Sequence, residues 1–116
     1  MAVVAQDDIA DVAATVLARP APHAGRTYSL TGPEALTLTE VAQILTETTG
    51  RLVRFENETL TQAYASRQSY GAPHWQLDAW VSTYTAIAAG EVAGVTGDVE
   101  SITGHPATSL RDLLTR

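Results

Sequence analysis

Lysine and cysteine are both missing from this 116-residue sequence, and its seven basic residues are all arginines. Without cysteine the chain has no disulfide bonds and no thiolate ligands for a metal. The arginines are scattered and the formal net charge is −6, so the sequence lacks the clustered basic surface of nucleic-acid-binding proteins. We therefore expect no nucleic-acid partner.

Long hydrophobic runs are missing as well. No apolar stretch approaches the roughly 18 residues that a membrane-spanning helix needs. The start, Met1–Val4, has neither the basic region nor the long apolar region of a secretory signal. We expect no membrane partner and a cytoplasmic location. Hydrophobic residues make up 45% of the chain, which is ordinary for a globular protein, and the length suits one domain over residues 1–116.

The clearest local pattern lies between Arg26 and Gly50. The run Thr27–Leu30 is rich in residues that favour strands, and Gly-Pro soon follows it. Thr37 and Glu40 then stand at the spacing of a capping box, which predicts a helix start. Gly50 predicts the end of that helix. Two further runs, residues 2–5 and 52–55, also read as short strands.

Apolar spacing predicts the other helices. One follows Asp7 or Asp8, and others begin near residues 59, 73 and 108, with a short helix near residues 99–102. Asp7 and Asp8 cap the first helix in one interpretation and face a ligand at a sheet edge in another. The predicted fold class is α/β, or α+β, with a small sheet of short strands and four to five helices.

Aromatic residues gather between residues 70 and 84, and this segment supplies the candidate site. An aromatic helix here forms either one wall of a cleft for a flat ring or part of the core. The spacing of Trp80 and Tyr84 favours core packing, whereas Trp75 lies off the apolar stripe. We predict that the substrate-binding residues are Tyr70, His74, Trp75, Trp80 and Tyr84.

Motifs for metals, nucleophiles and nucleotides are absent. The three histidines are far apart in sequence, and none stands in a metal-ligand spacing. There is no Gly-x-Ser-x-Gly, no Gly-x-Gly-x-x-Gly and no Walker sequence. We therefore predict no catalytic, cofactor-binding or metal-binding residue, while a serine–histidine–aspartate triad assembled only by the fold stays open at this point.

The segment Tyr28–Thr37, preceded by Asp8-Ile9-Ala10 and closed by Gly50, resembles the C-terminal half of the NmrA-like proteins. These are atypical relatives of the short-chain dehydrogenases/reductases, and they include NAD(P)H-dependent quinone reductases and redox-sensing regulators. The resemblance runs from Val3 to Leu114. The family's dinucleotide-binding half, with its glycine-rich turn, has no counterpart here.

The resemblance implies a substrate-side lobe of an NAD(P)-dependent reductase that acts on a quinone or similar small acceptor. NAD(P) then belongs to the complete protein, and this chain alone is expected to bind no cofactor and to be inactive. The alternatives are a lobe of a nucleotide-sensing regulator, or a non-catalytic binding or dimerisation module. The usual short-chain dehydrogenase pair, tyrosine with lysine four residues later, is absent, because the tyrosines are followed at that offset by Gly32, Gln68, His74 and Ala88.

The missing half also predicts a homodimer. In the family, the strand matching Val3-Val4 continues a sheet that the nucleotide-binding half mostly builds. An unpaired apolar edge is a template for another chain, and the next helix carries an apolar stripe that needs cover. We expect a two-fold dimer centred on Val3, Val4, Val12 and Val16.

Overall fold

The computed structural model describes residues 1–116; its regular elements are all helical, and it has no β-strand. It contains six α-helices and two short 3-10 turns. In chain order the elements are α1 (Gln6–Ala18), η1 (Ala21–His23), α2 (Leu38–Thr49), α3 (Leu60–Arg67), η2 (Gln68–Tyr70), α4 (His74–Ala88), α5 (Asp98–Thr103) and α6 (Leu110–Thr115).

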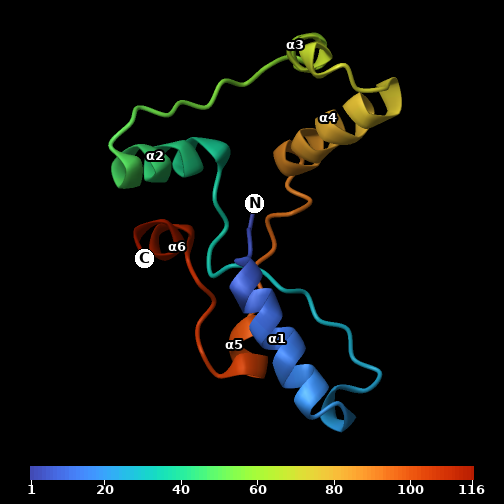
Figure 1. The fold of residues 1–116 in the computed structure, drawn as a ribbon, viewed down its shortest axis with the longest axis vertical. Helices are drawn as coiled ribbons and strands as arrows, with labels where there is room; N and C mark the ends of the chain where they lie inside the picture. Colours follow the sequence, from blue (N-terminus) through green and yellow to red (C-terminus); the bar gives the residue numbers. More distant parts are fainter.

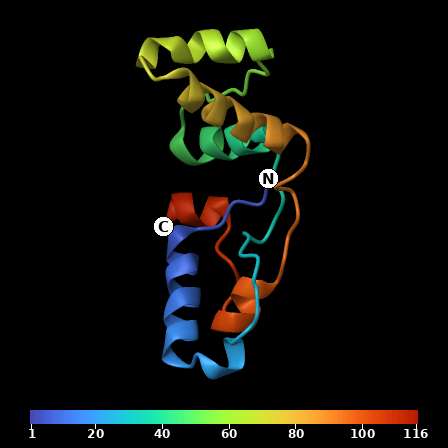
Figure 2. The ribbon, with the colours of Figure 1, turned by 90° about the vertical axis from the view of Figure 1, so that its right-hand side faces the viewer.

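The helices form two groups joined by extended segments (Figure 1). At one end of the molecule α1 packs against α5, and towards the other end α6 packs against α2 and α3 against α4 (Figures 1 and 2). The radius of gyration is 17.2 Å, whereas a compact domain of this length has about 13 Å. Only 10 of 116 residues are buried, so much apolar surface stays uncovered. None of the helices combines the length and apolar character needed to cross a bilayer.

The predicted small sheet is the main correction. Residues 2–5, 27–30 and 52–55 are extended or irregular but do not pair as strands. Between the first of these segments and the rest of the chain there are only single bonds, such as Ala2 N–H to the Val92 carbonyl (2.8 Å). A strand needs a continuous ladder with a neighbour. These short runs have β-forming composition but no neighbouring strand within this chain, so the α/β assignment was wrong for it.

The run 52–55 shows what replaces a ladder. The backbone N–H of Val53 donates to the hydroxyl of Thr46 on α2 (2.9 Å). The same hydroxyl lies 3.1 Å from the Val53 carbonyl oxygen and 2.9 Å from that of Ala42. One side chain therefore satisfies backbone groups that a sheet would otherwise take. The segment is held to a helix, as a strand would be held to its neighbour.

The helix signals of the sequence are confirmed with one exception. Thr37 with Glu40, and Thr59 with Gln62, form complete capping boxes, and Gly50 closes α2 in the left-handed conformation with φ 70°. The exception is Asp8. The N-cap of α1 is Ala5, with no side-chain cap, and Asp8 is instead 2% exposed with partners in a distant segment.

Gly32 has a different role from the one expected of it. It was interpreted as a residue that stops a strand, but its importance lies in a close approach between two segments. A Cβ added there would lie 2.1 Å from the carbonyl oxygen of Val3. Only a glycine lets the 31–36 segment lie against the N-terminal segment, where the N–H of Leu36 also donates to the Met1 carbonyl at 2.7 Å.

The apolar stripe of α1 is only partly covered. Val12 is buried, at 6% exposure, on the face that packs against α5. Ile9 and Leu17 remain exposed, at 43% and 78%. A dimer centred on Val12 would therefore have to displace α5. The homodimer stays a prediction, and its interface fits the exposed side of the helix better than the buried one.

Candidate functional site

A large hollow lies where the start of α2, the 55–58 segment, α3 and α4 meet. Its volume is about 770 Å³, and 12 of its 19 lining residues are hydrophobic. Ligand pockets are usually of about 300–1,000 Å³, mostly apolar with a few polar groups. The hollow therefore has the size and lining of a site for a small organic molecule.

The apolar walls of this hollow come from three elements. Val81 of α4 lines it and is only 4% exposed. Phe55, Leu60 and Tyr84 line it with 43%, 59% and 49% of their surface exposed. Large side chains left exposed around a concavity favour a ligand, because burying them against it releases water from apolar surface.

Arg67, at the end of α3, supplies a cation to this wall. Its guanidinium carbon lies 5.2 Å from the centroid of the Tyr84 ring, a cation–π arrangement. Its Nη1 donates to the Ala63 carbonyl (2.9 Å) and lies 4.0 Å from Glu58 Oε1. The contact with Glu58 is long, so the guanidinium is held mainly by its own helix and by the tyrosine.

A second hollow of about 610 Å³ shares Glu58, Arg67 and Tyr84 with the first. It adds Tyr70 and Trp80, whose rings meet edge to face with centroids 5.8 Å apart. Because three residues line both hollows, we treat them together as the aromatic cleft. Tyr70 is 73% exposed, so the cleft is open to solvent.

The structure brings only some of the predicted residues to this cleft. Tyr70, Trp80 and Tyr84 line it, whereas His74 and Trp75 do not. Trp75 is 71% exposed on α4, and His74 stacks on Tyr64 with ring centroids 5.9 Å apart. That these residues bind a substrate remains a prediction. No sequence motif marks Arg67, Phe55 or Leu60, which only the folded chain brings to the cleft.

Tyr64 and Asp78 tie α3 to α4 beside the cleft. The phenol hydroxyl donates to Asp78 Oδ1 at 2.6 Å. This hydrogen bond to a carboxylate raises the pKa of Tyr64 above its usual range, with smaller contributions from desolvation and from the charge of Asp78. The Tyr64 hydroxyl thus acts as a hydrogen-bond donor between the two helices.

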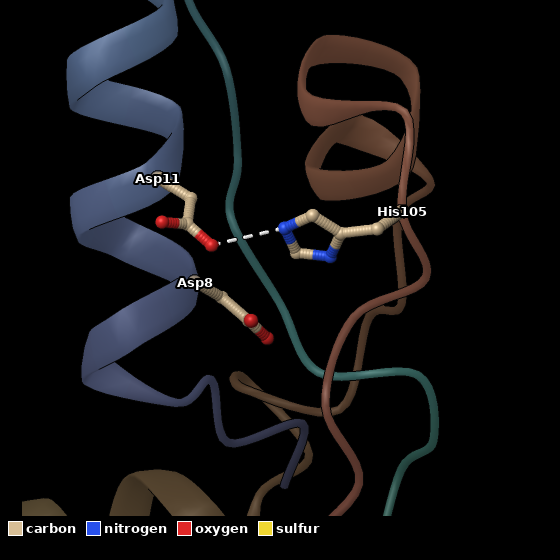
Figure 3. Close-up of side chains that lie close together, drawn as sticks. All are labelled: Asp8, Asp11 and His105. Carbon is tan, nitrogen blue, oxygen red and sulfur yellow. Dashed lines mark hydrogen bonds and ion pairs between the residues drawn. The ribbon is translucent and has the colours of Figure 1, made fainter.

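A polar cluster in the other helix group joins α1 to the segment after α5 (Figure 3). Thr108 donates to Asp8 twice, from its N–H to Oδ2 (2.7 Å) and from its hydroxyl to Oδ1 (2.9 Å). His105 Nε2 lies 3.0 Å from Asp11 Oδ2, and its Nδ1 lies 2.9 Å from the Pro106 carbonyl. Both partners of the imidazole accept hydrogen bonds, so this geometry suits the protonated ring.

The pKa of His105 is accordingly raised, first by the bond to the Pro106 carbonyl and then by Asp11. Asp8, Asp11 and His105 offer ligand atoms within 4.8 Å of one another. A metal would require Nε2 without its proton, and both oxygens of Asp8 already accept from Thr108. The cluster is therefore a hydrogen-bonded clamp. Sequence spacing puts Asp8 and Asp11 on one helix face, but nothing local links them to His105.

The helix starts do not fit a dinucleotide. A pyrophosphate needs free N–H groups at a helix N-terminus, usually after a glycine-rich turn. The starts of α2 and α3 are taken by Glu40 with Thr37 and by Gln62 with Thr59. The first turn of α1 carries Asp7 and Asp8, whose charge would repel a phosphate. These three helix starts therefore do not offer the free N–H groups that hold a pyrophosphate.

Comparison with known proteins identifies the relationship. No family model matches the sequence. The NAD(P)H azoreductase of Xenophilus azovorans is 37% identical over 105 residues, which are 90% of this chain and 36% of the relative. Quinone oxidoreductase 2 of Escherichia coli is 30% identical over 105 residues, with the same shares. The solved structure of an NADPH-dependent quinone oxidoreductase from that organism superposes with a TM-score of 0.87 at 29% identity.

The chain matches the C-terminal part of NmrA-like proteins over most of its length, and it spans a little over a third of each curated relative. The superposition covers 99% of this chain but 42% of that solved chain. The chain therefore corresponds to the C-terminal, substrate-side part of such proteins, as residues 28–37 predicted. The triphenylmethane reductase of Citrobacter agrees, with a TM-score of 0.84 at 27% identity over 98% of this chain and 39% of its own. The fold of the chain is thus that of an NmrA-like lobe, with helices and extended segments but no sheet of its own.

Proposed function

We propose that this chain is the acceptor-side lobe of an NAD(P)H-dependent reductase, and that the aromatic cleft binds a quinone or a similar flat acceptor. The observation that carries the proposal is the open cleft of about 770 Å³ with Tyr84 and Arg67 on its wall. Relatives named as an azoreductase and a quinone oxidoreductase support the same class of acceptor.

The lobe supplies positioning rather than electrons. Hydride transfer is the chemistry of a bound nicotinamide, which we assign to the dinucleotide-binding half of the complete protein. Its residues can stack against the acceptor ring, exclude water from one face and donate a hydrogen bond from the Arg67 guanidinium to an acceptor oxygen. A cleft filled by its own side chains would favour a regulator, whereas the exposure of Tyr70 and Tyr84 favours an enzyme lobe.

The two tryptophans allow a direct binding test. Trp80 lines the cleft and Trp75 does not, so Trp75→Phe leaves a reporter in the cleft and Trp80→Phe leaves one outside it. Menadione should quench the fluorescence of the first variant with a dissociation constant of tens to hundreds of micromolar, about 5–6 kcal/mol of binding. The second variant is the matched control for light absorption by the quinone.

Tyr84→Ala in the Trp75→Phe background should weaken menadione binding roughly twofold to tenfold, the usual contribution of one aromatic contact. If menadione quenched both tryptophans equally, or did not quench Trp80, the acceptor would not bind in the cleft. The chain alone should bind neither NADH nor NADPH below about 100 μM and should not oxidise them with menadione. Tight dinucleotide binding by calorimetry would contradict the assignment as an acceptor-side lobe.

A further inference from the structure

The aromatic cleft is larger than a single small acceptor requires. Its two hollows have volumes of about 770 Å³ and 610 Å³, and they share Glu58, Arg67 and Tyr84. Pockets that bury a whole drug-sized molecule usually measure about 300–1,000 Å³, so either hollow alone is large enough for one ring system. An acceptor with a single ring system would therefore leave one of the two hollows to water.

The two hollows differ in their linings. Of the 12 hydrophobic residues that line the first, only Phe55 and Tyr84 are aromatic. The apolar side chains of the second hollow are all aromatic and are those of Tyr70, Trp80 and Tyr84. Aromatic rings gain from stacked or edge-to-face contact with one another beyond the area that they bury. The first hollow thus suits any apolar group, whereas the second favours an aromatic ring.

Tyr70 provides the free aromatic surface of the second hollow. It is 73% exposed, and it meets the half-buried Trp80 edge to face with ring centroids 5.8 Å apart. A ligand ring placed against Tyr70 would remove apolar surface from water and add an aromatic contact. Because Tyr70 lines the second hollow and not the first, this gain is confined to a ligand that reaches the second hollow.

Tyr84 and Arg67 lie where the two hollows adjoin. The guanidinium carbon of Arg67 is 5.2 Å from the centroid of the Tyr84 ring, and both residues line both hollows. A ligand that occupies the two hollows must therefore pass over this pair. Since the hollows share lining residues, a short linker is enough to join its two parts.

We infer that the aromatic cleft takes two-part acceptors, with an apolar ring system in the first hollow and an aromatic ring, joined by a short linker, in the second. Tyr70 is the residue that selects the second ring. This inference rests on the proposed function of the cleft. It predicts that adding an aromatic ring to a small quinone strengthens binding, and that the added affinity depends on Tyr70.

Three quinones that share one ring system provide the test. They are menadione, menadione with a benzyl group on the ring carbon next to its methyl group, and menadione with a cyclohexylmethyl group there. All three are neutral, because the cleft lining itself balances Glu56 and Glu58 with Arg67 and the Met1 ammonium. The probes therefore compare shape and aromatic character rather than charge.

Dissociation constants are measured by quenching of Trp80 in the Trp75→Phe chain. The benzyl compound should bind roughly tenfold more tightly than menadione, because it also buries a ring in the second hollow. It should bind roughly threefold more tightly than the cyclohexylmethyl compound, which has a similar size but no aromatic ring. The cyclohexylmethyl compound thus controls for hydrophobicity alone.

Variants in the same background assign the preference to Tyr70. Tyr70→Ala should abolish the preference for benzyl over cyclohexylmethyl and leave the affinity for menadione unchanged, whereas Tyr70→Phe should keep the preference because it keeps the ring. Leu60→Ala is the matched control, because Leu60 is an exposed residue that lines the first hollow only. It should weaken all three quinones by a similar factor and leave their ratios unchanged.

The outcomes separate the inference from the proposed function. If menadione binds but the benzyl and cyclohexylmethyl compounds bind equally, or if Tyr70→Ala keeps the benzyl preference, the two-part acceptor is refuted and the binding cleft stands. A benzyl preference that Leu60→Ala removes as fully as Tyr70→Ala would also refute it. If no quinone quenches Trp80, the cleft is not the acceptor site, and the inference is refuted with the proposed function.

Discussion

The two helix groups of this lobe are held in different ways. Around α1 and α5, segments distant in sequence meet through buried or directed contacts: Val99 is 1% exposed, and Asp8 holds Thr108 through two hydrogen bonds. In the group with α3 and α4, α3 has no buried residue, and Trp80 and Tyr84 of α4 line a hollow. The contacts of the first group fix how its segments lie against one another, whereas the second group leaves apolar surface free for a ligand.

This difference teaches how a chain with few buried residues still has a defined arrangement. The hydrophobic contribution is small where only eight apolar residues are buried. The relative positions of the segments then depend on polar contacts, and losing such a contact leaves a buried group without a partner. Substitutions in the clamp or beside the N-terminal segment should therefore destabilise the fold much more than equivalent substitutions around the cleft.

The largest effect is expected at Gly32. Gly32→Ala should destabilise the fold by about 3 kcal/mol or more, because its new methyl group would collide with the Val3 carbonyl, 2.1 Å away. Gly94→Ala is the matched control, since nothing lies within 4 Å of a Cβ there, and it should change stability by less than about 0.5 kcal/mol. Urea unfolding followed by circular dichroism measures both, and equal stability of the two variants would disprove the close approach.

A smaller effect is expected from a matched pair of aspartates, one in each group. Asp8→Asn should cost roughly 1.5–3 kcal/mol, since the amide cannot accept both hydrogen bonds from Thr108. Asp78→Asn removes the carboxylate that accepts from Tyr64 at an exposed position and should cost less than about 1 kcal/mol. Thr108→Val should be coupled to Asp8→Asn in a double-mutant cycle. If Asp78→Asn lowered the free energy of unfolding more than Asp8→Asn, the expected difference between the two groups would be contradicted.

The smallest effect is a dependence on pH that only the clamp should show. The folded state raises the pKa of His105, so its contribution to stability is complete below the unfolded value of about 6.5 and is lost as pH rises through the folded pKa. The urea midpoint should therefore fall as pH increases from 6 towards 8. His105→Gln should remove this slope, and an NMR titration of the ring should show the raised pKa. A slope that survives in His105→Gln would assign it to another group.

Short-range patterns determined the helices of this protein. Thr37 with Glu40, and Thr59 with Gln62, produce capping boxes because all the partners lie within three residues. Gly50 ends α2 because it takes up φ 70° without a Cβ penalty. The stretch 28–37, with its flanking residues, was also sufficient to predict the family, although the chain covers only a little over a third of its curated relatives.

Only the tertiary structure decided the pairing of distant segments. Residues 2–5, 27–30 and 52–55 have strand-forming composition, but a strand exists only where a neighbour supplies a ladder, and this chain supplies none. Asp8 looks like a helix cap from its neighbours, yet its partner is Thr108, one hundred residues away. Arg67 reaches Tyr84 for the same reason, since α3 and α4 fold back on each other. Local propensity acts over a few residues, whereas the clamp and the cleft depend on contacts that only the folded chain creates.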